Sequence, residues 1–326
     1  MLGNITAVLF SLLIAFGGAE LVVRFALDTG LQYDIEMWKY ARELKRVSED
    51  PNIGHEHQPN SRAYLMGAEV RINEYGFRDD SFLAKKQEAE IRIVLIGDST
   101  TFAWGVAQEK TQAAVMEDLL AERGINSEVL NTGVGNYNSV MQANAFFKHA
   151  DTIKPDIIVI NYFINDAEPI PNYAVSFLDK YSMAWIYFSS RMGVAARTFG
   201  MGGNVDWKTY YDGLYNEKTG DGWREAQNAL ARLFSYGRKN NIPVIFAHLP
   251  EVRRLLPYPF APIRDKLAKF AAYHDIPFLD YLDFVRNEEP SSLWVTVPDP
   301  HPNAKAQRLF AIGLIDYLEK QNFFID

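Results

Sequence analysis

A regular alternation of apolar strands with amphipathic helices begins at residue 91 and constrains the fold more than any other feature of the chain. Strands are expected at Ile91–Ile96, Glu128–Leu130, Asp156–Tyr162, Pro243–Leu249 and Pro277–Leu279. Helices are expected at Thr111–Arg123, Val140–Ile153, Trp223–Lys239, Ile263–Tyr273 and Ala304–Lys320. Strands that alternate with helices at this spacing predict an α/β fold with a parallel sheet covered on both faces.

Two segments depart from this alternation. Tyr173–Gly222 interrupts it with a largely helical insertion, which we expect to lie over the active end of the sheet. Tyr33–Ser48 has the spacing of a short amphipathic helix, and Asp50–Asp80 is irregular except for a short strand at Glu69–Asn73. The chain therefore divides into an apolar segment at 1–30, a lead-in at 31–90 and a domain at 91–326 with its insertion at about 173–222.

The apolar segment is long enough to cross a membrane. As a helix, Ile5–Leu27 is about 35 Å long at about 1.5 Å per residue, and a hydrocarbon core is about 30 Å thick. A cleaved signal peptide is the alternative, because small residues up to Ala19 offer a cleavage site. However, Met1–Asn4 lacks basic residues and the apolar run continues past that site, so we favour a retained anchor.

The residues after this segment leave its orientation open. By the positive-inside rule, basic residues on the C-terminal side of the span would keep the rest of the chain in the cytoplasm. These residues are Arg24, Lys39, Arg42, Lys45 and Arg46.

Composition excludes several classes of site. Lys and Arg number 33 against 41 Asp and Glu, and the resulting net charge of −8 argues against nucleic acid as a partner. The chain has no cysteine, which excludes a disulfide framework, a thiolate nucleophile, an iron–sulfur cluster and a Cys-ligated zinc.

Polar side chains follow the expected strands at the sheet edge where ligands bind in such folds. Ser99 follows the first strand, the glycine-containing loop Gly133–Asn138 follows the second, and Asn165 with Asp166 follows the third. Asp299 and His301 precede the last helix, whose expected N-cap is Asn303. Each motif alone is a common turn or cap. Together they supply the nucleophile, base, carboxylate and oxyanion donors that acyl transfer needs.

These motifs resemble the four conserved blocks of the SGNH (GDSL) hydrolases. The matching blocks are Gly97-Asp98-Ser99 within Gly97–Val106, the loop Gly133–Asn138, Asn165-Asp166, and His301-Pro302-Asn303. The resemblance implies a three-layer flavodoxin-like fold and ester hydrolysis or acyl transfer, without a cofactor or a metal. In addition, Ile72–Asp79 resembles a lead-in of membrane-attached bacterial members near polysaccharide gene products, which implies a periplasmic or extracellular catalytic domain.

The resemblance also implies roles for individual residues. Ser99 would attack the ester carbonyl, and His301 would take its proton and pass it to the leaving alcohol. The oxyanion would be held by the Ser99 N–H, a backbone N–H of the second block and the side-chain amide of Asn165. That backbone donor is Gly133, Gly135 or Asn136, since a strict count from Asn131 reaches Asn136.

Two departures from the family pattern affect these assignments. The family's aspartate lies three residues before the histidine, where this chain has Pro298. We therefore expect Asp299 to orient His301 through a bend of the proline-flanked loop. Phe163 replaces the glycine of Gly-x-Asn-Asp, which changes the loop without removing the Asn165 donor.

Other candidate sites have weaker support. His55 and His57 lack a carboxylate cluster beyond Glu56, so a metal site is disfavoured. His248 ends an expected strand, and a structural histidine is the preferred interpretation. Phe177–Phe199 is apolar enough for a lid or a membrane-facing helix, although core packing is preferred.

Several functions fit this sequence. The leading hypothesis is a membrane-anchored serine esterase that removes acetyl or similar small acyl groups from an envelope carbohydrate. A polysaccharide O-acetyltransferase would use the same residues, and a lysophospholipase or thioesterase would need a long apolar pocket. A non-catalytic scaffold of an envelope complex is the alternative from another class. The sequence indicates no particular protein partner.

Overall fold

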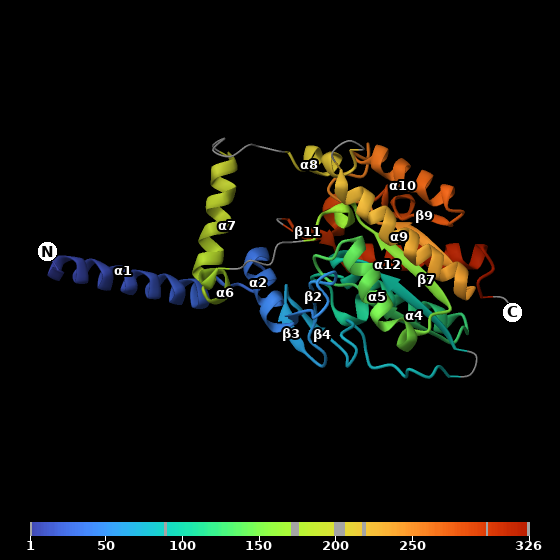
Figure 1. Ribbon diagram of the computed structural model, residues 1–326, viewed down its shortest axis with the longest axis horizontal. Helices are drawn as coiled ribbons and strands as arrows, with labels where there is room; N and C mark the ends of the chain where they lie inside the picture. Colours follow the sequence, from blue (N-terminus) through green and yellow to red (C-terminus); the bar gives the residue numbers. More distant parts are fainter. Residues whose placement is uncertain are drawn as a thin grey trace.

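The centre of the molecule is a five-stranded parallel sheet (Figure 1). The computed structural model describes residues 2–87, 90–170, 176–198, 206–216, 220–297 and 299–324. The strands are β5 (Ile91–Ile96), β6 (Ser127–Asn131), β7 (Ile157–Tyr162), β8 (Val244–His248) and β9 (Phe278–Asp280). Their spatial order is β6-β5-β7-β8-β9, the flavodoxin-like arrangement. The sequence-based prediction of a parallel sheet is thereby confirmed.

Helices cover both faces of the sheet. They are α4 (Gln112–Glu122), α5 (Ser139–Ile153), α9 (Asp221–Asn240), α10 (Ala261–Tyr273) and α12 (Ala304–Lys320). The chain reverses its direction across the sheet at β6, so right-handed crossovers put α4 on one face and α5, α9 and α10 on the other. α4 packs against α12, and α5 packs against α9.

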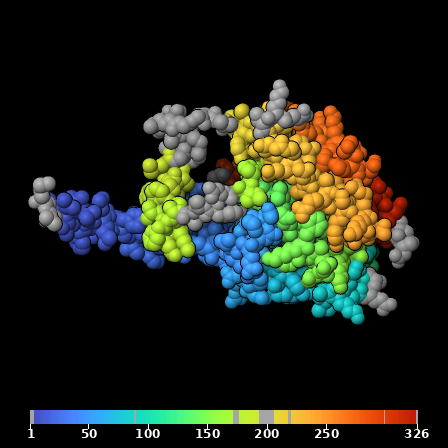
Figure 2. Space-filling model, viewed as in Figure 1, coloured from blue at the N-terminus to red at the C-terminus, as the bar shows by residue number. Residues whose placement is uncertain are grey.

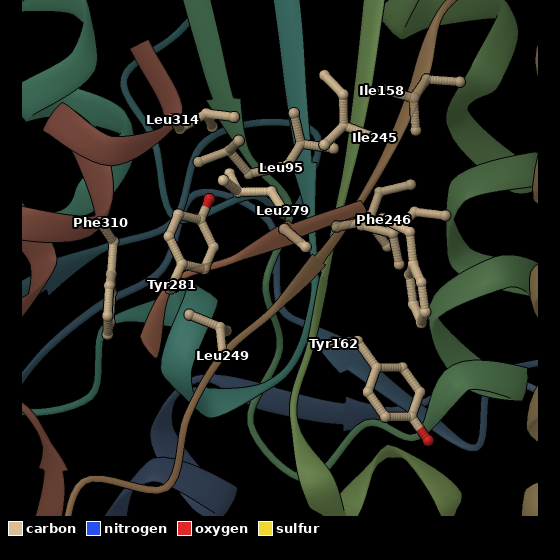
Figure 3. Close-up of a cluster of buried hydrophobic side chains, with 14 of the residues drawn as sticks. Leu95, Ile158, Tyr162, Ile245, Phe246, Leu249, Leu279, Tyr281, Phe310 and Leu314 are labelled. Atoms are coloured by element: carbon tan, nitrogen blue, oxygen red, sulfur yellow. The ribbon is translucent and has the colours of Figure 1, made fainter. Parts of the chain in front are cut away.

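The core between these layers is made of the apolar strand residues and the helix faces that meet them. Figure 3 shows Leu95, Ile158, Ile245 and Phe246 of the sheet, and Phe310 of α12 closes the same cluster. All five side chains are fully buried. Burial of each such side chain contributes about 1.5–3 kcal/mol, which makes the sheet a rigid support for the loops at its carboxyl edge.

The lead-in contains more regular structure than expected. The predicted helix Tyr33–Ser48 is α2 only over Tyr33–Glu43, and the prediction is wrong beyond it because β1 (Lys45–Val47) pairs with β2 (His55–His57). A second hairpin consists of β3 (Arg62–Leu65) and β4 (Ala68–Arg71). Its turn residues Met66 and Gly67 both have positive φ, as a tight two-residue hairpin requires.

The apolar N-terminal segment forms α1 (Leu2–Val22), which continues as a π-helical turn, η1 (Val23–Leu27). Figure 1 shows α1 projecting from the rest of the molecule, and its apolar side chains are exposed. Asn4–Leu27 is long and apolar enough to cross a membrane, a property that a signal sequence shares. The last turns are nevertheless integrated into the fold, since Val23 is fully buried.

The described residues of the expected insertion form α6 (Phe177–Tyr181), α7 (Met183–Thr198) and α8 (Trp207–Leu214), which precede α9. Tyr173, Phe199 and the Gly200–Asn204 loop lie outside the described residues. α7 packs on α2 and the end of the N-terminal helix rather than over the sheet, as Figures 1 and 2 show. Met183 and Ala184 are buried in a small cluster with Val23 and Ile35, so the preference for core packing holds for that part of the segment. Large apolar side chains on it are exposed: Phe177, Tyr181, Trp185, Phe188 and Met192.

Short elements carry the polar loops. They are α3 (Ser99–Phe102), η2 (Gln108–Lys110), η3 (Ile164–Ala167), α11 (Leu282–Val285), η4 (Pro290–Leu293), β10 (Trp294–Thr296) and β11 (Asp299–Pro302). β10 and β11 pair as an antiparallel hairpin directly before α12. This hairpin brings the C-terminal part of the chain to the carboxyl edge of the sheet.

Candidate active site

Ser99, His301 and Asp299 form a connected chain of hydrogen-bonding groups at the carboxyl edge of the sheet. The Ser99 Oγ lies 3.0 Å from the Nε2 of His301. The Nδ1 of the same imidazole lies 2.5 Å from the Oδ1 of Asp299. A hydroxyl, an imidazole and a carboxylate connected in this order are the arrangement of a serine hydrolase.

Asp299 is held by more than its histidine partner. Its Oδ2 accepts a 2.9 Å hydrogen bond from the indole N–H of Trp104, and the side chain is almost fully buried. Burial acts to raise the pKa of Asp299, but the hydrogen bonds and charge of His301 outweigh it and keep that pKa below its ordinary value. Asp299 lies on strand β11 rather than on the expected loop, while Pro298 lies outside the described residues.

Ser99 is presented by the first turn of α3. Asp98 is the N-cap of this helix, and its carboxylate accepts a 2.8 Å hydrogen bond from the backbone N–H of Thr100. The Ser99 hydroxyl lies 3.3 Å from the same carboxylate. Burial raises the pKa of Asp98, and the hydrogen bond from Thr100 opposes the shift.

Asn165 reaches the site from the 3₁₀ turn that follows β7. Its side chain hydrogen-bonds to the Asp98 carboxylate, so the amide nitrogen must be the donor. Its Oδ1 is buried without a partner among the described residues. Asp98 therefore orients both the serine and the amide.

In the second block, Gly133–Asn138, some backbone groups are bonded inside the protein and others lie beside the cavity. The Gly135 N–H donates a 3.0 Å hydrogen bond to the hydroxyl of Tyr40, so it is directed away from a substrate. Asn136 has φ 66°, a left-handed conformation that asparagine tolerates better than most residues. Asn136 is exposed and lines the cavity beside Ser99.

Gly133 lies deeper than either of these residues. A Cβ on Gly133 would approach the backbone nitrogen of Phe102 to 2.3 Å, so the loop packs directly on α3. Gly133 is therefore needed for the close approach of two backbone segments.

A cavity of about 250 Å³ opens over the serine. Its lining combines the site residues with Tyr33 of α2, Phe163 after β7, Tyr211 of α8, and Glu251 and Arg253 after β8. The Arg253 guanidinium and the Glu251 carboxylate form an ion pair of 3.0 Å. The cavity is thus small, partly aromatic and partly polar.

The sequence analysis missed several contributors, most of which come from outside the four blocks. Tyr33 stacks on the His301 ring with centroids 6.1 Å apart, and it comes from the lead-in. Trp104 belongs to the first block, but nothing in its spacing indicated a bond to Asp299. Tyr40 and Lys45 contact the second block from α2 and β1.

Side chains of the Ile72–Asp79 motif hydrogen-bond to the backbone of the first block and to that of Asn131, just before the second block. The guanidinium of the buried Arg78 donates 2.6 Å hydrogen bonds to the backbone carbonyls of Phe102 and Ala103, and another to that of Val106. The Asp79 carboxylate accepts a 2.7 Å bond from the backbone N–H of Asn131. This part of the lead-in therefore fixes the loop after Ser99.

The remaining histidine candidates have other partners. His55 Nε2 lies 3.0 Å from the Gly135 carbonyl, and His57 lies 2.7 Å from the Tyr40 hydroxyl. Across the described ranges, no group of three or more His, Asp or Glu side chains is placed to hold a metal ion. His248 is buried and pairs with Asp280 at 2.8 Å, which fits the structural interpretation.

Sequence comparison identifies the family of this protein. The model of the GDSL-like Lipase/Acylhydrolase family matches residues 95–309, more than half of the chain. The protein therefore belongs to this family and is an SGNH/GDSL-type ester hydrolase. No curated protein matches the chain in sequence.

Several solved structures are similar to this chain at low sequence identity. TesA is 16% identical over 70% of this chain and 98% of its own, with a TM-score of 0.44. The psychrotrophic esterase EstA from Pseudoalteromonas sp. is 14% identical over 71% and 97%, also at 0.44. The acetyl xylan esterase AlAXEase is 13% identical over 70% and 100%, at 0.40.

Proposed function

We propose that the protein is a membrane-anchored serine esterase that removes acetyl or other small acyl groups from an envelope carbohydrate. The observation that carries the catalytic part is the bonded series of Ser99, His301 and Asp299, at 3.0 Å and 2.5 Å. A base within hydrogen-bond distance of a nucleophile, itself oriented by a carboxylate, is the geometry that acyl transfer requires.

The proposed reaction proceeds through an acyl-enzyme. Ser99 Oγ attacks the ester carbonyl carbon while its proton passes to His301 Nε2. The Ser99 N–H, the Asn136 N–H and the Asn165 amide donate hydrogen bonds to the oxyanion. The C–O bond of the ester then breaks, and the leaving alcohol takes the proton from His301. Water next attacks the acyl carbon and gives a proton to the same imidazole. The bond between Ser99 Oγ and the acyl carbon then breaks, and Ser99 takes its proton back from His301 as the acid leaves.

The size and lining of the cavity support a small acyl group on a polar substrate. Its volume of about 250 Å³ falls below the range of about 300–1,000 Å³ of pockets for drug-sized ligands. Tyr33 and Tyr211 offer flat faces, while Glu251 and Arg253 offer hydrogen-bonding groups suited to hydroxyls. A long acyl chain would need a larger apolar cavity.

The contacts of the N-terminal helix support its retention as an anchor. The Glu20 carboxylate accepts 3.0 Å hydrogen bonds from the backbone N–H groups of Met183 and Ala184, and thereby caps α7. It also pairs with Arg24, which consequently is not a free positive charge. We propose that the catalytic part lies in the periplasm or outside the cell, where envelope carbohydrates are found.

Hydrolysis of p-nitrophenyl esters of increasing chain length tests the proposed activity. Ser99-dependent turnover that is fastest with acetyl is the expected result. A preference for long chains would contradict the small-acyl assignment. Turnover that rises when a sugar acceptor is added would identify a transferase instead, and absence of any turnover would contradict the proposal.

A further inference from the structure

The Gly135–Asn136 peptide is held almost entirely by the lead-in, a part of the chain outside the residues that the family model matches. The Gly135 carbonyl accepts a 2.7 Å hydrogen bond from Lys45 Nζ, and the Nε2 of His55 lies 3.0 Å from the same oxygen. Lys45 also lies 3.3 Å from the Asn136 Oδ1. One carbonyl oxygen thus has two side-chain donors, one of them a lysine.

The geometry of the peptide unit connects these contacts to the cavity. A trans peptide is planar, so its C=O and the N–H of the next residue point in opposite directions. With the Gly135 carbonyl directed at Lys45 and His55, the Asn136 N–H points away from them. Asn136 lines the cavity beside Ser99, so this is the side on which a substrate carbonyl would lie.

The other backbone group of Gly135 is fixed by a second series of lead-in side chains. Its N–H donates to Tyr40, whose hydroxyl lies 2.7 Å from His57 Nε2. His57 Nδ1 lies 3.0 Å from the Gly76 carbonyl, which only accepts, so Nδ1 carries the proton and Nε2 accepts from Tyr40. A Cβ on Gly135 would approach the Tyr40 ring to 2.8 Å, so the contact requires glycine.

We infer that Lys45, with His55, is a positioning residue that aims and polarises the Asn136 N–H as an oxyanion donor. A cation on a carbonyl oxygen draws electron density from the peptide, and hydrogen bonds in series strengthen one another in this way. The donor is thereby oriented before the substrate arrives, which is what oxyanion stabilisation requires. This inference rests on the proposed ester hydrolysis.

If Lys45 acts through its charge, the rate of ester hydrolysis should depend on the protonation state of Lys45. Burial lowers the pKa of Lys45 to about 7, and the ammonium lies 4.2 Å from the centre of the Tyr40 ring. The titratable groups that face it are Tyr40, His55 and His57. Burial and the charge of Lys45 lower the pKa values of both histidines to about 3, so both are neutral at physiological pH. The polarising charge is present below about pH 7 and is lost above it.

The test compares Lys45→Met and Lys45→Arg with the wild type, using the full chain in detergent and p-nitrophenyl acetate. Lys148→Met is the matched control. Lys148 pairs at 2.5 Å with Glu56, the neighbour of His55 on β2, and makes no hydrogen bond to Gly135 among the described residues. We expect Lys45→Met to lower kcat by about 10- to 100-fold with little change in KM, less than the loss of an oxyanion donor itself, about 10²–10³-fold. Binding of a trifluoromethyl ketone, which forms a tetrahedral oxyanion with the serine, should weaken by the same factor.

Lys45→Arg keeps a charge at every accessible pH. It should therefore retain most of the kcat and lose the decline above about pH 7. This variant decides the matter even if Lys45→Met fails to fold. An unchanged decline in Lys45→Arg, or equal rates for Lys45→Met and Lys148→Met, would overturn the inference alone. Absence of Ser99-dependent turnover in the wild type would overturn the proposed function and the inference with it.

Discussion

The ring of Tyr33 lies stacked on the imidazole of His301, with the two planes 24° apart and the centroids separated by 6.1 Å. Tyr33 is the first residue of α2, six positions after the end of the apolar N-terminal helix, whereas His301 precedes the last helix of the chain. The lead-in thus covers the exposed face of the base. Since the protein is an ester hydrolase, this contact connects the lead-in to the proposed catalytic histidine.

Removal of the Tyr33 ring should make His301 a less effective base, although the imidazole itself stays in place. Contacts between aromatic rings contribute about 0.5–1.5 kcal/mol, so Tyr33→Ala should lower kcat/KM by about 2- to 10-fold. Tyr33→Phe keeps the stacked ring and should remain close to the wild type. Initial rates with p-nitrophenyl acetate compare the two variants, and equal losses in both would show that the hydroxyl, rather than the ring, matters.

Replacement of Ser99 by alanine should abolish turnover. Loss of the nucleophile of a serine hydrolase costs about 10⁶-fold in kcat, because the remaining groups cannot form the acyl-enzyme. The melting temperature should change little, since the Ser99 hydroxyl has, among the described residues, a 3.3 Å contact with Asp98 besides that with His301. Activity of the variant near that of the wild type would remove Ser99 as the nucleophile.

Asp299 and Trp104 should differ in the size of their effects. Asp299→Asn should lower kcat by about 10⁴-fold, because an amide no longer holds the imidazole in the required tautomer. Trp104→Phe removes only one donor to that carboxylate, and a hydrogen bond to a charged group contributes about 1.5–3 kcal/mol. Its rate should fall by a smaller factor, accompanied by a lower melting temperature. If Asp299→Asn had little effect, another group would have to orient His301.

The parallel sheet could be predicted from the sequence for a physical reason. Buried strands and amphipathic helices repeat locally, and parallel strands bring their carboxyl ends to one edge, so Ser99 and Asn165 were expected to lie together. The contributions of Tyr33, Tyr40 and Lys45 arise from contacts between distant segments, which no local pattern encodes. Lys45 in particular looked like one of several basic residues after a membrane span.

The oxyanion donor illustrates the same limit. The count of residues in the second block allowed Gly133, Gly135 or Asn136. The choice depends on which backbone N–H is already bonded inside the protein, and Tyr40 of the lead-in occupies that of Gly135. Such contacts become visible only in the tertiary structure, and the bond from Gly135 to Tyr40 is the reason why we propose Asn136 as the donor.

The proposed anchor can be tested in membranes of a bacterial host. If the N-terminal helix is retained, the full-length chain should stay in the pellet after a carbonate wash, and its mass should include the residues before Glu20. A soluble chain shortened near Ala19 would instead indicate a cleaved signal peptide. Mass spectrometry of the pellet and the supernatant separates the two outcomes.

The side of the membrane can be tested separately, because the chain has no cysteine of its own. Tyr273→Cys on α10, at a side chain that is 83% exposed, provides a single reactive thiol. A membrane-impermeant maleimide should label it in intact spheroplasts if the catalytic part lies outside the cytoplasm. Labelling only after lysis would place that part inside and contradict the proposal.

The free energy of unfolding should also depend on the protonation state of Lys45. The pKa of Lys45 is lowered by burial from 10.5 to about 7 in the folded state. Between these two values the unfolded chain binds a proton that the folded chain has lost, so this group makes stability rise with pH across that window. Below about pH 7 both states are protonated, and the full cost of the buried charge applies.

Lys45→Met removes this dependence. Urea unfolding of the full chain in detergent should show that the free energy of unfolding of the wild type, relative to Lys45→Met, increases between about pH 6.5 and about pH 9.5. The free energy of unfolding of the wild type relative to Lys148→Met should not change with pH over the same range. The charged form of Lys45 lowers the stability of the protein, yet it is the form that orients the oxyanion donor. Such a loss of stability in return for activity is expected at a functional site. If the difference did not change with pH, Lys45 would keep its proton throughout, and the expected decline in rate above about pH 7 would need another cause.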